Sequence, residues 1–65
     1  MPAYAFEIKW TGGEKVSWTY LPTDDRARDF ARILMHNFKH NGQHQGSALM
    51  LVKNTDGAEI ASIEF

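Results

Sequence analysis

Three histidines near the middle of the chain come closest to a pattern that could do chemistry. His36 and His40 would share one face of a helix, and their i, i+4 spacing can hold Zn²⁺ or another divalent ion. His44 follows in a polar stretch and could fold back as a third ligand. A helix end that favours cations explains the same pattern without a metal. A metal site of His36, His40 and His44 is therefore one hypothesis, and we expect no cofactor.

The other polar residues form no recognisable catalytic motif. The carboxylates are spread along the chain, and no spacing places two of them in one pocket as an acid–base pair. Ser17, Ser47 and Ser62 lack the neighbouring residues that would activate a nucleophile. The pair Gly12-Gly13 is too little for a phosphate-binding loop and indicates a turn. We therefore expect that the protein is not an enzyme.

A basic edge offers a third kind of site. Arg28, Arg32 and Lys39 would lie along the exposed side of a helix, where they could contact phosphates while a tryptophan stacks on a base. Three aspartates in the same segment dilute this charge, and the chain as a whole carries a net charge of -1. Nucleic-acid-binding proteins normally carry a basic face. Nucleic-acid binding through these three residues is therefore the alternative function.

These candidates depend on one predicted helix, from Thr23 to His40. Apolar side chains recur in it at helical spacing and form one stripe, namely Ala27, Phe30, Ala31, Leu34 and Phe38. Pro22 precedes the segment, and Thr23 or Asp24 can cap the first turn. Asn41-Gly42 signals the end of the helix. The rest of the chain reads as strands and turns.

Two alternating stretches before the helix predict a hairpin, with residues 4–10 in one strand and 16–20 in the other. A two-residue loop at Gly12-Gly13 would place the aromatic side chains of the two strands on opposite faces. A three-residue loop, Gly12 to Glu14, would place them all on one face. Because a slip of one residue flips a whole strand, we expect the three-residue loop, with Val16, Trp18 and Tyr20 in the core.

Residues 48–64 predict a second hairpin around an Asn-Thr-Asp-Gly turn. A three-residue loop, 55–57, would place Gly57 where a left-handed conformation is favoured. Counting outward from that loop, the core side holds Leu49, Leu51, Ala61, Ile63 and Phe65. Met50, Val52 and Ile60 would then lie on the other face. A two-residue turn at Asp56-Gly57 would exchange the two sets.

Together these elements predict a single small α+β domain over residues 1–65, in the order strand-strand-helix-strand-strand (ββαββ). One helix, about 10 Å wide, would pack on one face of an antiparallel-rich, four-stranded sheet that is roughly 19 Å wide. One helix is too narrow for that sheet, unless sheet twist and large aromatic side chains close the gap. We therefore expect a homodimer with Met50, Val52 and Ile60 in its interface and Ala5 as a further contact.

Several residues at the ends and at the entry to the helix resemble one known family. They are Met1-Pro2, Tyr4, Phe6, Leu21-Pro22, Asp24, Asp56-Gly57 and Phe65. The family consists of short bacterial proteins, stand-alone domains of unknown function with strand-strand-helix-strand-strand order. The resemblance implies this element order and brings no catalytic residue. Trp10 and Trp18 make the first hairpin unusually aromatic for the family, and Glu64 stands where a proline often precedes the final Phe.

Composition restricts the function further. Hydrophobic residues make up 43% and aromatic residues 12% of the chain, which argues against disorder. No apolar run approaches the roughly 18 residues of a membrane span, and the first residues do not resemble a secretory signal. The absence of Cys fits a reducing compartment, so we expect a cytoplasmic protein without membrane association. The leading hypothesis is a homodimeric protein-interaction module, open to a further protein partner.

Overall fold

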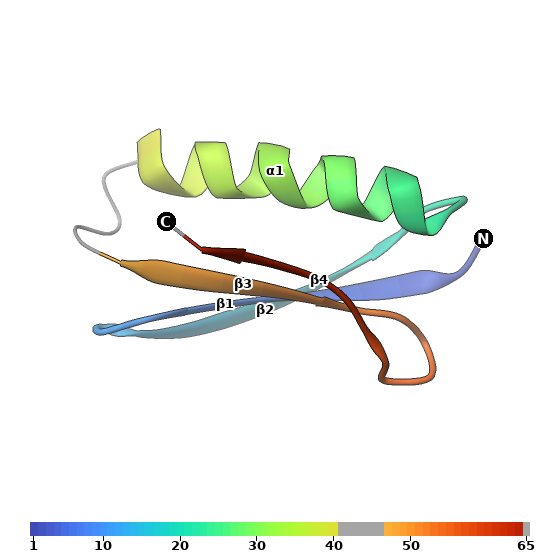
Figure 1. The fold of residues 1–65 in the computed structure, drawn as a ribbon, viewed down its shortest axis with the longest axis horizontal. Coiled ribbons are helices and arrows are strands. Elements are labelled where there is room, and N and C mark those ends of the chain that lie inside the picture. Colours follow the sequence, from blue (N-terminus) through green and yellow to red (C-terminus); the bar gives the residue numbers. More distant parts are fainter. Residues whose placement is uncertain (41–46, 65) are drawn as a thin grey trace.

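One helix lies along one face of a four-stranded antiparallel sheet in the computed structural model of the chain (Figure 1). The structure describes residues 1–40 and 47–64. The elements are β1 (Ala3–Trp10), β2 (Gly13–Tyr20), α1 (Asp24–His40), β3 (Ala48–Lys53) and β4 (Glu59–Glu64). The strands lie in the order β2-β1-β3-β4, so the first strand of each hairpin is central and the second is at an edge. The predicted ββαββ fold is confirmed.

The helix begins and ends where the sequence predicts. Thr23 caps its first turn, because the backbone N–H of Arg26 donates a hydrogen bond to Thr23 Oγ1 at 3.2 Å. Acidic residues occupy the first turn, and Lys39 and His40 occupy the last, as the helix dipole favours. The chain therefore enters the helix at a fixed point directly after Pro22.

The core lies between α1 and the central strands. Its helix residues are Ala27, Ala31, Met35 and Phe38, and its sheet residues are Tyr4, Phe6, Ile8, Ala48, Met50 and Val52. The two alanines let the helix approach the sheet closely, while Phe30 packs edge-on against Phe6 with ring centroids 5.3 Å apart. Near the other end of the helix, the rings of Trp10 and Phe38 are tilted by 58° to each other, with their centroids 5.1 Å apart. Met35 is the core residue that the predicted stripe missed.

The first hairpin has a shorter loop than we expected. Trp10 pairs with Gly13, so the loop is Thr11-Gly12, and the register places Trp18 beside Ala5 instead of Ile8. The prediction that Val16, Trp18 and Tyr20 lie in the core is therefore wrong. The Trp10 indole packs over this turn, because a Cβ on Gly12 would lie 2.8 Å from Trp10 Nε1. A residue with a side chain would not fit there without movement of the ring.

The second hairpin has the predicted loop but a different register beyond it. Gly57 has a φ of 84°, and the backbone N–H of Asn54 donates to the carbonyl of Ala58, which closes the loop 55–57. The side chain of Asn54 accepts hydrogen bonds from the N–H groups of Asp56 and Ala58 at 3.0 and 2.9 Å. The predicted three-residue loop 55–57 is therefore confirmed.

A β-bulge next to this loop reverses the faces of β3. Lys53 pairs with Glu59 but Val52 pairs with Ala61, so Ile60 is an extra residue on β4. Met50 and Val52 consequently point toward the helix and are 0% exposed. The predicted outer position of Met50 and Val52 is therefore wrong, because the register was counted without a bulge.

The two other predicted contact residues are also covered. Ile60 packs partly against the core. Ala5 does lie on the face away from the helix, but it is only 3% exposed because Trp18 and Lys53 flank it on the neighbouring strands. None of the four residues that we expected in an interface is thus fully exposed in the single chain. Phe65, expected in the core, lies outside the described residues.

A buried hydroxyl ties β1 to the start of the helix. Tyr4 donates a hydrogen bond from its hydroxyl to Asp24 Oδ1 at 2.7 Å. This bond, together with burial and the negative charge of Asp24, raises the pKa of Tyr4 above its ordinary value of 10.0, and the nearby Arg28 opposes the shift. Tyr4 therefore keeps its proton at neutral pH, and its contact with Asp24 is structural.

The two faces of β3 lead to a direct test of the bulge. Met50→Ala removes a fully buried side chain and should lower the free energy of unfolding by about 2–5 kcal/mol or prevent folding. Leu49→Ala, on the half-buried outer side, should cost about 1 kcal/mol or less. Urea unfolding at equal protein concentration measures both values. A larger loss for Leu49→Ala than for Met50→Ala would contradict the observed register.

The raised pKa of Tyr4 leads to a second prediction. Because the folded state holds the proton more tightly than the unfolded state, the stability that Tyr4 contributes is complete below pH 10 and falls as the pH rises through the folded pKa. Tyr4→Phe should be less stable than the wild type at about pH 8, and this difference should shrink as the pH rises above 10 and through the raised pKa of Tyr4. Urea unfolding over a series of pH values checks it, and a constant difference would refute the linkage.

Candidate functional site

The most distinctive surface of the molecule is the outer side of β2, on the sheet face away from α1. Val16, Trp18 and Tyr20 are 53%, 63% and 69% exposed there. We call these three residues the β2 patch. The helix side of the same strand instead holds polar residues such as Ser17 and Thr19. The polarity of β2 is thus the reverse of what a sheet covered on one face normally shows.

The sheet face around the β2 patch is apolar near the patch and carries a charged pair farther from it. Small alanines of β1 lie beside it, and Leu49 and Leu51 of β3 are half-buried on the same face. A salt bridge between Lys53 Nζ and Glu7 Oε2, at 3.0 Å, crosses this face between the strands. Apolar centres with polar borders are the usual composition of protein–protein interfaces.

The helix side of β2 holds only a small groove. The helix lies closest to β3 and β4, which leaves space between α1 and β2. The groove has a volume of about 210 Å³ and is lined by Phe6, Ile8, Lys15, Ser17, Leu34, Asn37 and Phe38. Ligand pockets usually measure about 300–1,000 Å³. The groove is therefore too small for a typical cofactor or substrate.

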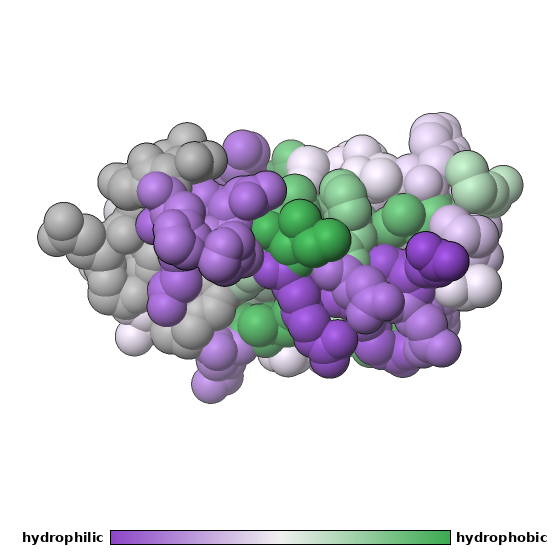
Figure 2. Space-filling view, turned by 90° about the horizontal axis from the view of Figure 1, so that it is seen from above, coloured by the Kyte–Doolittle hydropathy of each residue, from purple (hydrophilic) through white to green (hydrophobic). Residues whose placement is uncertain are grey.

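The basic edge of the helix is occupied by internal contacts. Arg28 pairs with Asp25 at 2.8 Å and Arg32 pairs with Asp29 at 3.3 Å. Arg28 also donates from Nε to the carbonyl oxygen of Ile60 in the bulge, at 3.3 Å. Figure 2 shows the helix side, where an apolar area extends from the middle toward the right of the view and hydrophilic residues lie to its left and below it. Nucleic-acid binding by Arg28, Arg32 and Lys39 stays a prediction, and both arginines would have to share their contacts.

The histidine pair is arranged as predicted, but the proposed triad is not complete within the described residues. The rings of His36 and His40 lie on the same helix face with their centroids 4.1 Å apart. His44 lies outside the described residues. Within residues 1–40 and 47–64, no group of three or more His, Cys, Asp or Glu side chains could hold a metal ion. A metal site at His36, His40 and His44 remains untested.

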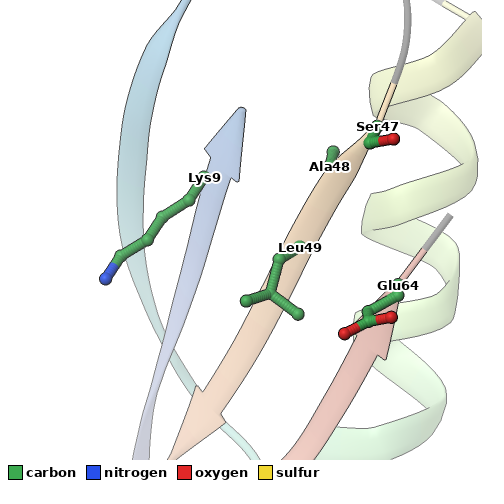
Figure 3. A pocket seen from close by; sticks show the side chains of 5 residues that line it. All are labelled: Lys9, Ser47, Ala48, Leu49 and Glu64. Carbon is green, nitrogen blue, oxygen red and sulfur yellow. The ribbon is translucent and has the colours of Figure 1, made fainter. Parts of the chain in front are cut away.

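A wider hollow lies at the far end of the sheet, where the side chains of Lys9, Leu49 and Glu64 project from three adjacent strands (Figure 3). It has a volume of about 550 Å³ and is also lined by Ser47 and Ala48. The charged side chains of Lys9 and Glu64 lie on either side of the apolar Leu49. Ser47 and Glu64 border residues that the structure does not describe, so the hollow is only partly defined and supports no assignment to a ligand.

The β2 patch was missed by sequence reasoning, although its signal was visible. The alternation in residues 16–20 shows that the apolar side chains share one face, but it does not show which face. Only the loop length relates β2 to β1, and the pair Gly12-Gly13 is compatible with several loops. The three-residue loop that we expected places these side chains in the core, whereas the two-residue loop Thr11-Gly12 places them on the outer face.

Among the described residues, no helix combines the length and apolar character needed to cross a bilayer.

Comparisons with other proteins identify no family for this chain. No protein-family model, curated protein or solved structure matches the chain. The resemblance to short bacterial domains thus has no support beyond the residues that suggested it.

Proposed function

We propose that this chain is a cytoplasmic, homodimeric protein-interaction module without catalytic activity, and that the β2 patch forms its contact surface. The observation that carries the proposal is the reversed polarity of β2. Its apolar side chains point away from the only helix of the described chain, while its polar side chains point toward it. A surface of this kind gains stability when a partner covers it.

The exposed area is large for so small a protein. Trp18 and Tyr20 are 63% and 69% exposed, so together they leave roughly 200–330 Å² open per copy if a buried aromatic side chain removes about 150–250 Å² from water. Two copies would contribute between about a third and a half of the roughly 1,200 Å² that a stable interface buries. Val16, neighbouring residues and backbone atoms can supply the remainder. A second copy is therefore a partner of suitable size.

The short chain gives a second reason for association. A domain of about 60 residues buries only about 60% of its unfolded surface and is marginally stable alone. The sequence has no Cys, so disulfides cannot stabilise it. Self-association is one of the usual ways in which such small domains gain stability. The same contact would cover part of the two most exposed aromatic side chains.

The test is the mass of the protein in solution. Wild-type protein should sediment as a dimer at micromolar concentration. Trp18→Lys should sediment as a folded monomer, because lysine replaces the apolar contacts of Trp18 with a partner and opposes association at an edge strand. Ile33→Lys is the matched control, since Ile33 is 57% exposed on the helix and lies outside the patch. This variant should remain a dimer.

Circular dichroism distinguishes loss of dimer from loss of fold in both variants. A wild-type monomer at micromolar concentration would overturn the proposal. So would a Trp18→Lys variant that remains a dimer with an unchanged dissociation constant, because the contact would then lie elsewhere.

A further inference from the structure

Within residues 1–40 and 47–64, β2 lies at an edge of the sheet, so the residues of the β2 patch have a strand neighbour on one side only. The N–H of Leu21 donates to the carbonyl of Pro2 at 3.1 Å, so this pair is a hydrogen-bonded pair of the antiparallel ladder. Such pairs alternate along a ladder. Residues 13, 15, 17 and 19 therefore direct their N–H and C=O groups toward β1. Glu14, Val16, Trp18 and Tyr20 direct theirs toward the open edge of the sheet.

Beyond the charged Glu14 and Lys15 next to the turn, this edge lacks the features that normally prevent strand pairing. Residues 16–20 carry no charge, no proline and no bulge, and they are β-branched or aromatic except for Ser17. The opposite edge is different. β4 contains the bulge at Ile60, its carbonyl accepts a hydrogen bond from Arg28, and glutamates stand at both ends of the strand. Among the residues that the structure describes, the β2 edge is thus the more open of the two to another strand.

We infer that two copies of the chain join through β2, which pairs antiparallel with β2 of the other copy around a two-fold axis to form one continuous sheet. This inference rests on the proposed homodimer and specifies its geometry. The occupant is a second copy because β2 is complementary to itself. Centring the axis at Ser17 lets every one of Glu14, Val16, Trp18 and Tyr20 pair its outward backbone groups.

The side chains agree with this register. Val16 would lie opposite the partner's Trp18, an aromatic–β-branched pair of the kind that stabilises antiparallel sheets. Glu14 would lie opposite the partner's Tyr20, and Lys15 opposite the partner's Thr19, so no like charges meet. If the axis lay at Val16, Tyr20 would face the partner's Gly12, and if it lay at Trp18, Glu14 would face the partner's Pro22. Neither Gly12 nor Pro22 belongs to the strand, so hydrogen bonds would be lost in both cases.

A single cysteine tests the register in a chain that has none. Ser17 would face its own copy in a non-hydrogen-bonded pair with Cα atoms about 4.5 Å apart, which lies within the range for a disulfide. Ser17→Cys should therefore convert to a covalent dimer under mild oxidation. Thr19→Cys, on the same side of the same strand, is the matched control and should remain largely uncrosslinked. Equal crosslinking of the two variants would overturn the register.

Amide hydrogen exchange tests the backbone pairing directly. In the wild type, the amides of Val16 and Tyr20 should exchange on the order of tenfold or more slowly than in the Trp18→Lys monomer. The amides of Ser17 and Thr19, which bond to β1, should be protected in both proteins. The protected set is therefore continuous in the dimer and alternating in the monomer.

The outcomes separate this inference from the proposed function. A wild-type dimer in which the outward amides exchange as fast as in the monomer would overturn the edge pairing, while the homodimer would stand with its sheets packed face to face. A wild-type monomer would overturn both.

Discussion

In each hairpin of this protein, a single residue decides which side chains are inside. Successive side chains of a strand point to opposite faces, so a change of one residue in loop or bulge turns a whole strand over. The loop Thr11-Gly12 turns the apolar side of β2 away from the helix. The bulge at Ile60 turns Met50 and Val52 toward it. The core and the open surface both follow from these two local features.

This arrangement resolves the difference in width between helix and sheet. The helix lies closest to β3 and β4 and shares its core with β1, so apolar side chains on the helix side of β2 would be poorly covered. The chain places polar Ser17 and Thr19 at that position instead. The unburied apolar surface is then concentrated on the other face of the sheet, around Trp18. This is why a contact surface is expected on β2 and not on the helix.

The parts that the sequence predicted are those decided by local chemistry. The helix follows from its apolar stripe, Pro22 and the Thr23 cap, and the loop 55–57 follows from Asn54 and Gly57. The faces of β2 and β3 depend on pairing between strands, which the alternating pattern leaves undetermined. The bulge has no clear signal in residues 58–61, since its partner Arg28 lies on the helix, far away in sequence. The predicted core position of Trp18 and outer position of Met50 are wrong because strand pairing decides both, the first through the loop length and the second through the bulge.

The bulge also bears on how far an assembly of these chains can grow. A sheet with two open edges can add copies without limit, and uncharged, aromatic edge strands are templates for fibres. Here Arg28 on the helix donates a hydrogen bond to the carbonyl of Ile60, the bulge residue without a strand partner. This contact makes the β4 edge less suitable for pairing with another strand. In the proposed dimer, the more open edge of each copy is used by the other, so growth terminates at two chains. Arg28 would then protect the protein from polymerisation as well as hold the helix to β4.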